Sequence, residues 1–110
     1  MKREREFFDV REIPVEPVEG QPAMTQRVLS HDDETGDCTR LLYFPPGHES
    51  QGVQVHDFWE EVYILSGSMH DITIDRTFTA GMYACRPPGM PHGPWRTPEG
   101  AVTFEMRYIR

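Results

Sequence analysis

Residues 52–67 read GVQVHDFWEEVYILSG, and polar and apolar residues alternate along most of this stretch. Such alternation is typical of a β-strand with one buried face. The stretch also carries His56, Glu60 and Glu61 among aromatic and aliphatic neighbours. An inward carboxylate without a partner costs several kcal/mol. The pattern therefore predicts a chemical role for Glu60, whereas Glu61 faces the other way and is expected on the exterior.

Short alternating runs recur on both sides of this stretch, between turns rich in glycine and proline such as FPPGHESQG and PPGMPHG. The expected strands are residues 24–30, 38–44, 52–56, 61–65, 70–74, 77–79, 82–86 and 101–109. The SGS at residues 66–68 is expected to form a turn. No helical periodicity is sustained after residue 20. Many short, evenly spaced strands indicate an all-β sandwich or barrel.

The first 22 residues differ from the rest. Pro14, Pro17 and Pro22, the last two within the segment VEPVEGQP, predict an extended arm over residues 1–22, followed by a single β domain over 23–110. The arm either follows the surface of its own domain or lies along a partner subunit.

The amino-acid composition argues against several classes of binding partner. The 110 residues fit one domain, and 18 acidic against 11 basic residues give a net charge of −7. This balance argues against nucleic acid or an anionic membrane as partner. No apolar run approaches the ~18 residues of a membrane span, and the charged N-terminus does not resemble a secretory signal. Cys38 and Cys85 could form a disulfide, but reduced thiols in a cytoplasmic protein are the favoured expectation.

Two histidines and a carboxylate stand out as possible metal ligands. His56 would close one strand, Glu60 would open the next, and His92 follows the proline-rich turn RPPGMPHG. Prolines restrict the backbone there and so would fix the position of His92. Gln54 lies two residues before His56, on the same face of the expected strand. Two imidazoles and one carboxylate form a metal site that leaves coordination positions open.

The spacing of these residues resembles the two motifs of the cupin superfamily: Gly52-x3-His56-x3-Glu60-x6-Gly67 and Gly81-x5-Pro87-Pro88-Gly89-x2-His92. Within that superfamily the chain is most similar to small single-domain cupins of the ChrR-like and dioxygenase-like kinds. The resemblance implies a double-stranded β-barrel of the jelly-roll type, a homodimer, and one divalent metal ion per chain. Fe²⁺ is favoured, and Zn²⁺, Mn²⁺ or Ni²⁺ are alternatives.

The resemblance also implies the metal ligands His56, Glu60 and His92. Many metal-binding cupins have a histidine where this chain has Gln54, which becomes either a weak fourth ligand or a donor to a metal-bound water. Met82 and Arg96 also depart from the usual pattern, at positions that affect the pocket rim.

Further pocket candidates lie beside the two motifs, although packing is the default role for the aromatic ones. They are Trp59, Tyr83, Arg86, Trp95, Arg96 and Phe104. Arg86 shares strand parity with Met82 and Ala84. If it faces inward, it could hold a substrate carboxylate or enolate; if outward, it is an ordinary ion-pair partner.

Two classes of function follow. The first is a small-molecule metalloenzyme, preferably an Fe(II)-dependent dioxygenase-like oxidoreductase acting on a diketone, enol or aromatic compound. The same site could instead serve a non-redox lyase, isomerase or cyclase that works through an enolate. The second class is a non-catalytic cupin that binds a metal or small ligand. No catalytic residue beyond the metal ligands is assigned from the sequence.

Overall fold

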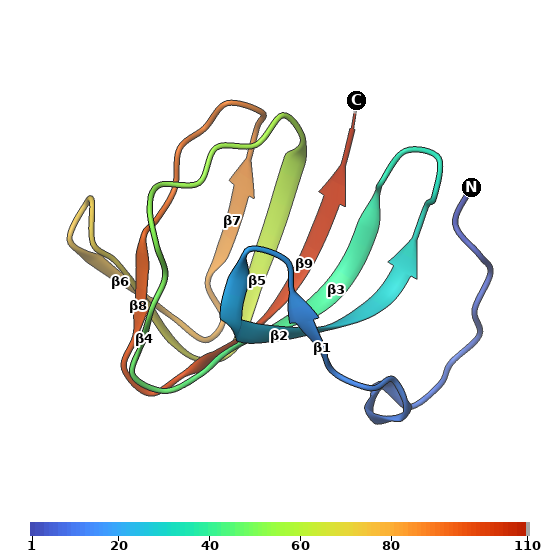
Figure 1. Cartoon of the computed structure of the whole chain (residues 1–110), viewed down its shortest axis with the longest axis horizontal. Coiled ribbons are helices and arrows are strands. Elements are labelled where there is room, and N and C mark those ends of the chain that lie inside the picture. The colour runs from blue at the N-terminus through green and yellow to red at the C-terminus, as the bar shows by residue number, and fades with distance from the viewer. Residues whose placement is uncertain (110) are drawn as a thin grey trace.

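The computed structural model describes residues 1–109, and its regular structure is almost entirely β (Figure 1). The strands are β1 (Glu16–Val18), β2 (Gln21–His31), β3 (Cys38–Phe44), β4 (His48–Glu49), β5 (Trp59–Asp71), β6 (Arg76–Thr79), β7 (Tyr83–Arg86), β8 (Trp95–Thr97) and β9 (Ala101–Tyr108). A 3₁₀ turn, η1, spans Val10–Glu12. No helix in this described part of the chain has the length and apolar character needed to cross a membrane. The predicted all-β class is confirmed.

The strands form one antiparallel sheet in the order β1-β2-β3-β9-β5-β8-β4, with β6 and β7 also paired to β5. Figure 1 shows this sheet curled into a half-barrel, with β4, β6 and β8 at one side. Curling brings the inner faces of strands that are not neighbours toward one another. The interior of the half-barrel is therefore where side chains from several strands can converge.

Strand β5 connects the two parts of the sheet, because its first half pairs with β7 and β9 and its second half with β6 and β8. Its register with β9 shifts between Ile64 and Ser66. At Gly67 the φ angle is +80°, and an added Cβ would lie 2.0 Å from the Gly100 carbonyl oxygen. Glycine is required for this close approach. The prediction of a turn at residues 66–68 was wrong, since the strand continues through a local irregularity.

Alternation along β5 separates an inner from an outer face. Val62 and Ile64 are 6% and 5% exposed, whereas Tyr63 and Leu65 are 43% and 48% exposed. The inner apolar side chains join a core that lies between the two parts of the sheet. Its buried members are Met24, Leu42, Phe44, Ile64, Met69, Trp95 and Ala101.

The stretch before β5 does not form the strand expected over residues 52–56. It is a loop whose regular pairing is a single antiparallel bridge between Gln54 and His92. Alternating polarity arises here because the loop has a cavity on one side and solvent on the other: Val53 and Val55 are more than half exposed, while Gln54 lines the cavity. The short strands β4 and β8, of two and three residues, carry too little pattern to be recognised from the sequence.

The N-terminal arm is shorter than the sequence suggests. Residues 16–22 belong to the sheet, because β1 pairs with the start of β2 and a hairpin joins them. The preceding residues lie against the same molecule: the Met1 amino group is 3.0 Å from Asp32 Oδ1, and the Arg5 guanidinium donates to the Leu29 carbonyl at 2.6 Å.

Candidate metal centre

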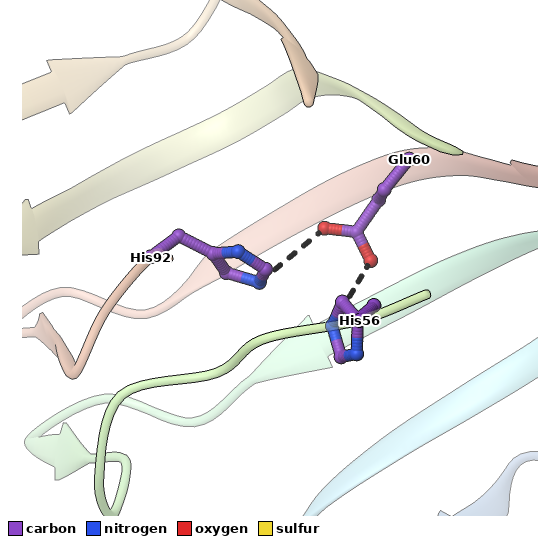
Figure 2. Close-up of side chains that lie close together, drawn as sticks. All are labelled: His56, Glu60 and His92. Atoms are coloured by element: carbon purple, nitrogen blue, oxygen red, sulfur yellow. Dashed lines mark ion pairs between the residues drawn. The ribbon is translucent and has the colours of Figure 1, made fainter. Parts of the chain in front are cut away.

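The structure brings together the three side chains that the sequence marks as ligands (Figure 2). His56 precedes β5, Glu60 is the second residue of β5, and His92 lies in the loop between β7 and β8. Their ligand atoms all lie within 4.8 Å of one another. Glu60 Oε1 is 3.7 Å from His92 Nε2, and Glu60 Oε2 is 3.9 Å from His56 Nε2.

Backbone hydrogen bonds hold the two histidine loops against each other. The Gln54 amide donates to the His92 carbonyl at 2.7 Å, and the His92 amide donates to the Gln54 carbonyl at 3.0 Å. The Gly89 amide donates to the His56 carbonyl at 2.8 Å. The prolines of the segment between β7 and β8 further restrict its backbone. Both imidazoles are thus held by a paired backbone as well as by side-chain packing.

Glu60 is held by two arginines. Its side chain is 5% exposed, and its oxygens accept hydrogen bonds from Arg86 at 2.9 Å and from Arg107 at 3.1 Å. Burial alone would raise the pKa of Glu60, but the positive charges of Arg107 and Arg86 outweigh it, and the pKa lies below its ordinary value. Glu60 is therefore ionised at neutral pH and could offer a metal an anionic oxygen.

Both histidines favour the neutral form that binds metal. Burial lowers the pKa of His56, and the charge of Glu60 only partly offsets this. Burial also lowers the pKa of His92, and Arg86 lowers it further. A lowered pKa means that the imidazole stays unprotonated to a lower pH than a histidine in water does. Nδ1 of His92 lies 3.4 Å from the Met90 carbonyl, which can only accept, so we assign the proton to Nδ1 and the free lone pair to Nε2.

The three side chains fit a divalent first-row ion. With bonds of about 2.1 Å, two donors on one ion lie at most about 4.2 Å apart. The two distances from Glu60 to the histidines are already below this limit. The remaining distance between the ligand atoms falls below it if each side chain moves inward by a few tenths of an ångström. Each carboxylate oxygen has two lone pairs, so each oxygen of Glu60 can accept a hydrogen bond from an arginine and bind a metal ion at the same time. Two nitrogens and one oxygen suit iron, zinc, manganese or nickel.

The centre opens into a cavity of about 190 Å³ inside the half-barrel. Apolar side chains such as Val62, Met69 and Trp95 form part of its wall. Gln54 also lines it, and its amide nitrogen donates to the Gln51 carbonyl at 3.4 Å. The amide oxygen of Gln54 is therefore not committed to that contact.

A row of charged side chains crosses the inner face of the sheet beside the centre, and the sequence reasoning missed most of it. The row runs Arg40–Glu105–Arg107–Glu60–Arg86 over strands β3, β9, β5 and β7. Arg40 pairs with Glu105 at 3.0 Å, and Arg107 lies 3.1 Å from Glu60 and 3.9 Å from Glu105. Its signal in the sequence is the parity of β9, in which Glu105 and Arg107 continue the buried positions 101 and 103.

Three other pocket candidates line cavities. Trp95 and Arg86 face both the main cavity and an adjacent apolar cavity of about 250 Å³. Tyr83 borders only the second cavity, and its hydroxyl donates to Glu61 on the outer face of the sheet. The Arg86 guanidinium lies 5.3 Å from the centre of the Trp95 ring. Arg86 thus faces inward, the alternative that the sequence left open.

Trp59, Arg96 and Phe104 line neither cavity, and strand parity explains each placement. Trp59 precedes the inward Glu60 and stacks on Tyr108. Phe104 lies between the buried residues 103 and 105, and Arg96 lies between the buried residues 95 and 97. All three side chains point to the outer side of their strands.

Comparison with known proteins places the chain in a family. The sequence model described as "ChrR Cupin-like domain" matches residues 3–108. No curated protein matches the sequence significantly.

Solved structures share the fold. An RmlC-like cupin from Shewanella frigidimarina is 21% identical, with 99% of this chain and 94% of that chain covered and a TM-score of 0.78. The polyketide cyclase RemF from Streptomyces resistomycificus is 18% identical, with coverages of 97% and 81% and a TM-score of 0.78. A candidate acetylacetone dioxygenase from Methylibium petroleiphilum is 18% identical, with coverages of 97% and 78% and a TM-score of 0.75. The predicted cupin fold is confirmed.

Proposed function

The chain belongs to the family of ChrR cupin-like domains, and from this premise we propose that it is a small-molecule metalloenzyme with one divalent ion per chain. The observation that carries the proposal is the convergence of His56, Glu60 and His92 on the wall of an internal cavity. A surface site of exposed acidic residues would lack the lowered histidine pKa values and the enclosing apolar wall found here.

Iron(II) is the metal we favour, and oxidative cleavage of a diketone, enol or aromatic compound is the reaction. When bound, such an ion would act as a Lewis acid and activate O₂. The ligand set of two histidines and one carboxylate is the one that non-haem Fe(II) oxygenases use. One solved relative of the same fold is described as a candidate acetylacetone dioxygenase, which supports the choice of substrate class at the level of fold.

The chain's own residues would bind and orient the reactants. Arg86 and Arg107 keep Glu60 ionised and fix its carboxylate plane, so that the ligand needs little rearrangement. Trp95 and Val62 exclude water from one side of the cavity. Gln54 would be a weak fourth ligand or a hydrogen-bond partner of a metal-bound water.

A reaction without oxidation is the second candidate, with a lyase, isomerase or cyclase working through a substrate enolate. It needs a base that is not a metal ligand. Glu105 is committed to Arg40 and Thr103, but Glu19 is exposed and lines the same cavity. A non-catalytic binding role is the third candidate, and Glu19 at the cavity rim, a titratable group that is not a metal ligand, argues against it.

We also propose that the protein is a homodimer. The outer face of the sheet exposes apolar side chains that lie side by side on β5, β7 and β9: Tyr63, Leu65, Tyr83 and Met106. Contiguous apolar surface of this kind is usually covered, and a second copy of the chain is the occupant we expect.

Oxygen uptake tests the proposed reaction. Metal-free protein is loaded with Fe²⁺ without oxygen, then mixed with oxygenated buffer and a panel of diketones, enols and catechols. We expect uptake with at least one compound, and none with Zn²⁺-loaded protein or with the iron-treated His92→Ala variant. If iron binds but no compound consumes oxygen, the dioxygenase proposal is wrong, and product analysis of the same mixtures decides for or against the non-redox candidate.

A further inference from the structure

The charged row Arg40–Glu105–Arg107–Glu60–Arg86 contains three positive and two negative groups. The side chains of Arg40, Glu60 and Glu105 are 5–7% exposed, and those of Arg86 and Arg107 are 13% and 27% exposed. The row is therefore largely shielded from water and carries one uncompensated positive charge. Buried charge of one sign requires a partner of the other.

No other group of the described residues 1–109 supplies this partner inside the cavity. Glu19 is the remaining carboxylate of the lining, but it is exposed at the rim, where water screens its charge. His56 and His92 cannot supply it either, because an imidazole is never negatively charged in this setting. A divalent ion at the candidate centre would increase the positive excess.

Arg107 is the arginine best placed to receive an anion. Each of the three guanidinium nitrogens of Arg40 already donates a hydrogen bond, to Glu105 or to Gln26. Arg107 donates through Nε to Glu60, and none of residues 1–109 accepts a hydrogen bond from its two terminal amino groups. Its guanidinium lies 5.0 Å from the centre of the Phe58 ring, which limits its freedom. A guanidinium held in this way offers a carboxylate two parallel donors.

We infer that the cavity selects small substrates that carry a carboxylate, which Arg107 binds with help from Arg86 while the rest of the molecule reaches the metal centre. The inference rests on the proposed function and narrows its substrate class. A volume of about 190 Å³ is also below the roughly 300 Å³ at which sites for drug-sized ligands begin, so the acid must be small.

Three compounds with the same 1,3-dicarbonyl skeleton test this inference. Malonate carries two carboxylates, acetoacetate carries one, and acetylacetone carries none. Their affinities are measured by calorimetry and by the change in tryptophan fluorescence, to which Trp95 in the cavity wall contributes, using both metal-free and Zn²⁺-loaded protein. The variants are Arg107→Gln and Arg107→Lys. Arg96→Gln is the matched control, because its guanidinium faces outward to Glu49.

For the parent protein and for Arg96→Gln we expect malonate to bind more tightly than acetoacetate, and acetoacetate more tightly than acetylacetone, by about tenfold at each step. Arg107→Gln should remove most of the difference, and Arg107→Lys should keep part of it, since the charge remains without the paired donors. In the parent protein, added salt should weaken the binding of malonate but not the binding of acetylacetone. This last comparison needs no variant and holds even if Arg107→Gln fails to fold.

Equal affinities for the three compounds, an order that Arg107→Gln leaves unchanged, or an absence of salt dependence would each overturn the inference. The proposed function fails separately, if Zn²⁺ and Fe²⁺ do not bind. The affinities of the three compounds for metal-free protein then still show whether the charged row binds an anion.

Discussion

Glu60 has two roles: it is a candidate metal ligand, and it is a buried member of the charged row. Two arginines hold its oxygens, and the same oxygens face the two imidazoles. Replacing this carboxylate therefore affects the fold as well as the metal. Its neighbour Glu61 has the opposite environment, on the outer face, where it accepts hydrogen bonds from Tyr83 and Tyr108.

The adjacent pair Glu60 and Glu61 gives a matched comparison of the two faces. Glu60→Gln leaves Arg86 and Arg107 without their shared counter-charge, so we expect the free energy of unfolding to fall by about 3–5 kcal/mol, as when one partner of a buried ion pair is removed. Glu61→Gln should cost less than about 1 kcal/mol, because this carboxylate is in contact with water. Urea denaturation measures both. Similar losses in the two variants would contradict the assigned environments.

Substitution of Gln54 tests whether its side chain takes part in metal binding. Imidazole binds first-row ions more strongly than a neutral amide does, so Gln54→His should retain the metal at higher chelator concentration than the parent protein. Gln51→His is the control, since Gln51 lies on the exposed side of the same loop and should leave metal retention unchanged. Retention that is the same in all three proteins would show that Gln54 is only part of the cavity wall.

At the element scale, strand alternation predicted those elements that pair along most of their length. The expected runs at residues 24–30, 38–44, 82–86 and 101–109 all fall on strands. The run at 52–56 is a loop, because a loop with a cavity on one side gives the same alternation as a strand. The SGS of β5 looked like a turn, since its close contact with Gly100 depends on a chain segment more than thirty residues away.

Gly67 should be far less tolerant of substitution than a loop glycine with the same backbone angle. Gly36 has φ +81° with nothing within 4 Å of an added Cβ, so Gly36→Ala should cost about 1 kcal/mol from backbone conformation alone. Gly67→Ala adds an overlap with the Gly100 carbonyl, which brings the expected loss to about 2–4 kcal/mol. Thermal unfolding of both variants measures the difference. Equal losses would mean that the irregularity in β5 can relax around a methyl group.

At the scale of the whole molecule, the sequence predicted that His56, Glu60 and His92 lie together, but not the charged row around them. His56 and Glu60 belong to one motif and His92 to the second, so the two motifs together mark all three residues. Arg40, Glu105 and Arg107 join them only through the order of strands in the curled sheet, which no local pattern encodes. Long-range pairing therefore determines the electrostatics of the cavity.

The expected homodimer depends on the apolar patch on the outer face of the sheet. Leu65 is 48% exposed and belongs to the apolar patch, so Leu65→Glu should convert a dimer into a folded monomer, measured by light scattering at high protein concentration. Ile74 is 54% exposed in the turn after β5 and does not belong to the patch, so Ile74→Glu should leave the mass unchanged. A parent protein that is already monomeric would contradict the dimer proposal.

The metal centre is tested most directly by titrating metal-free protein with Co²⁺ and recording the visible absorption of the bound ion. We predict saturation at one equivalent per chain, and loss of the signal in His56→Ala and in His92→Ala. His31→Ala should bind as the parent protein does, because His31 pairs with the exposed Asp33 at the surface. No saturable signal in the parent protein, or an unchanged signal in the His56 and His92 variants, would contradict a metal centre built on these residues.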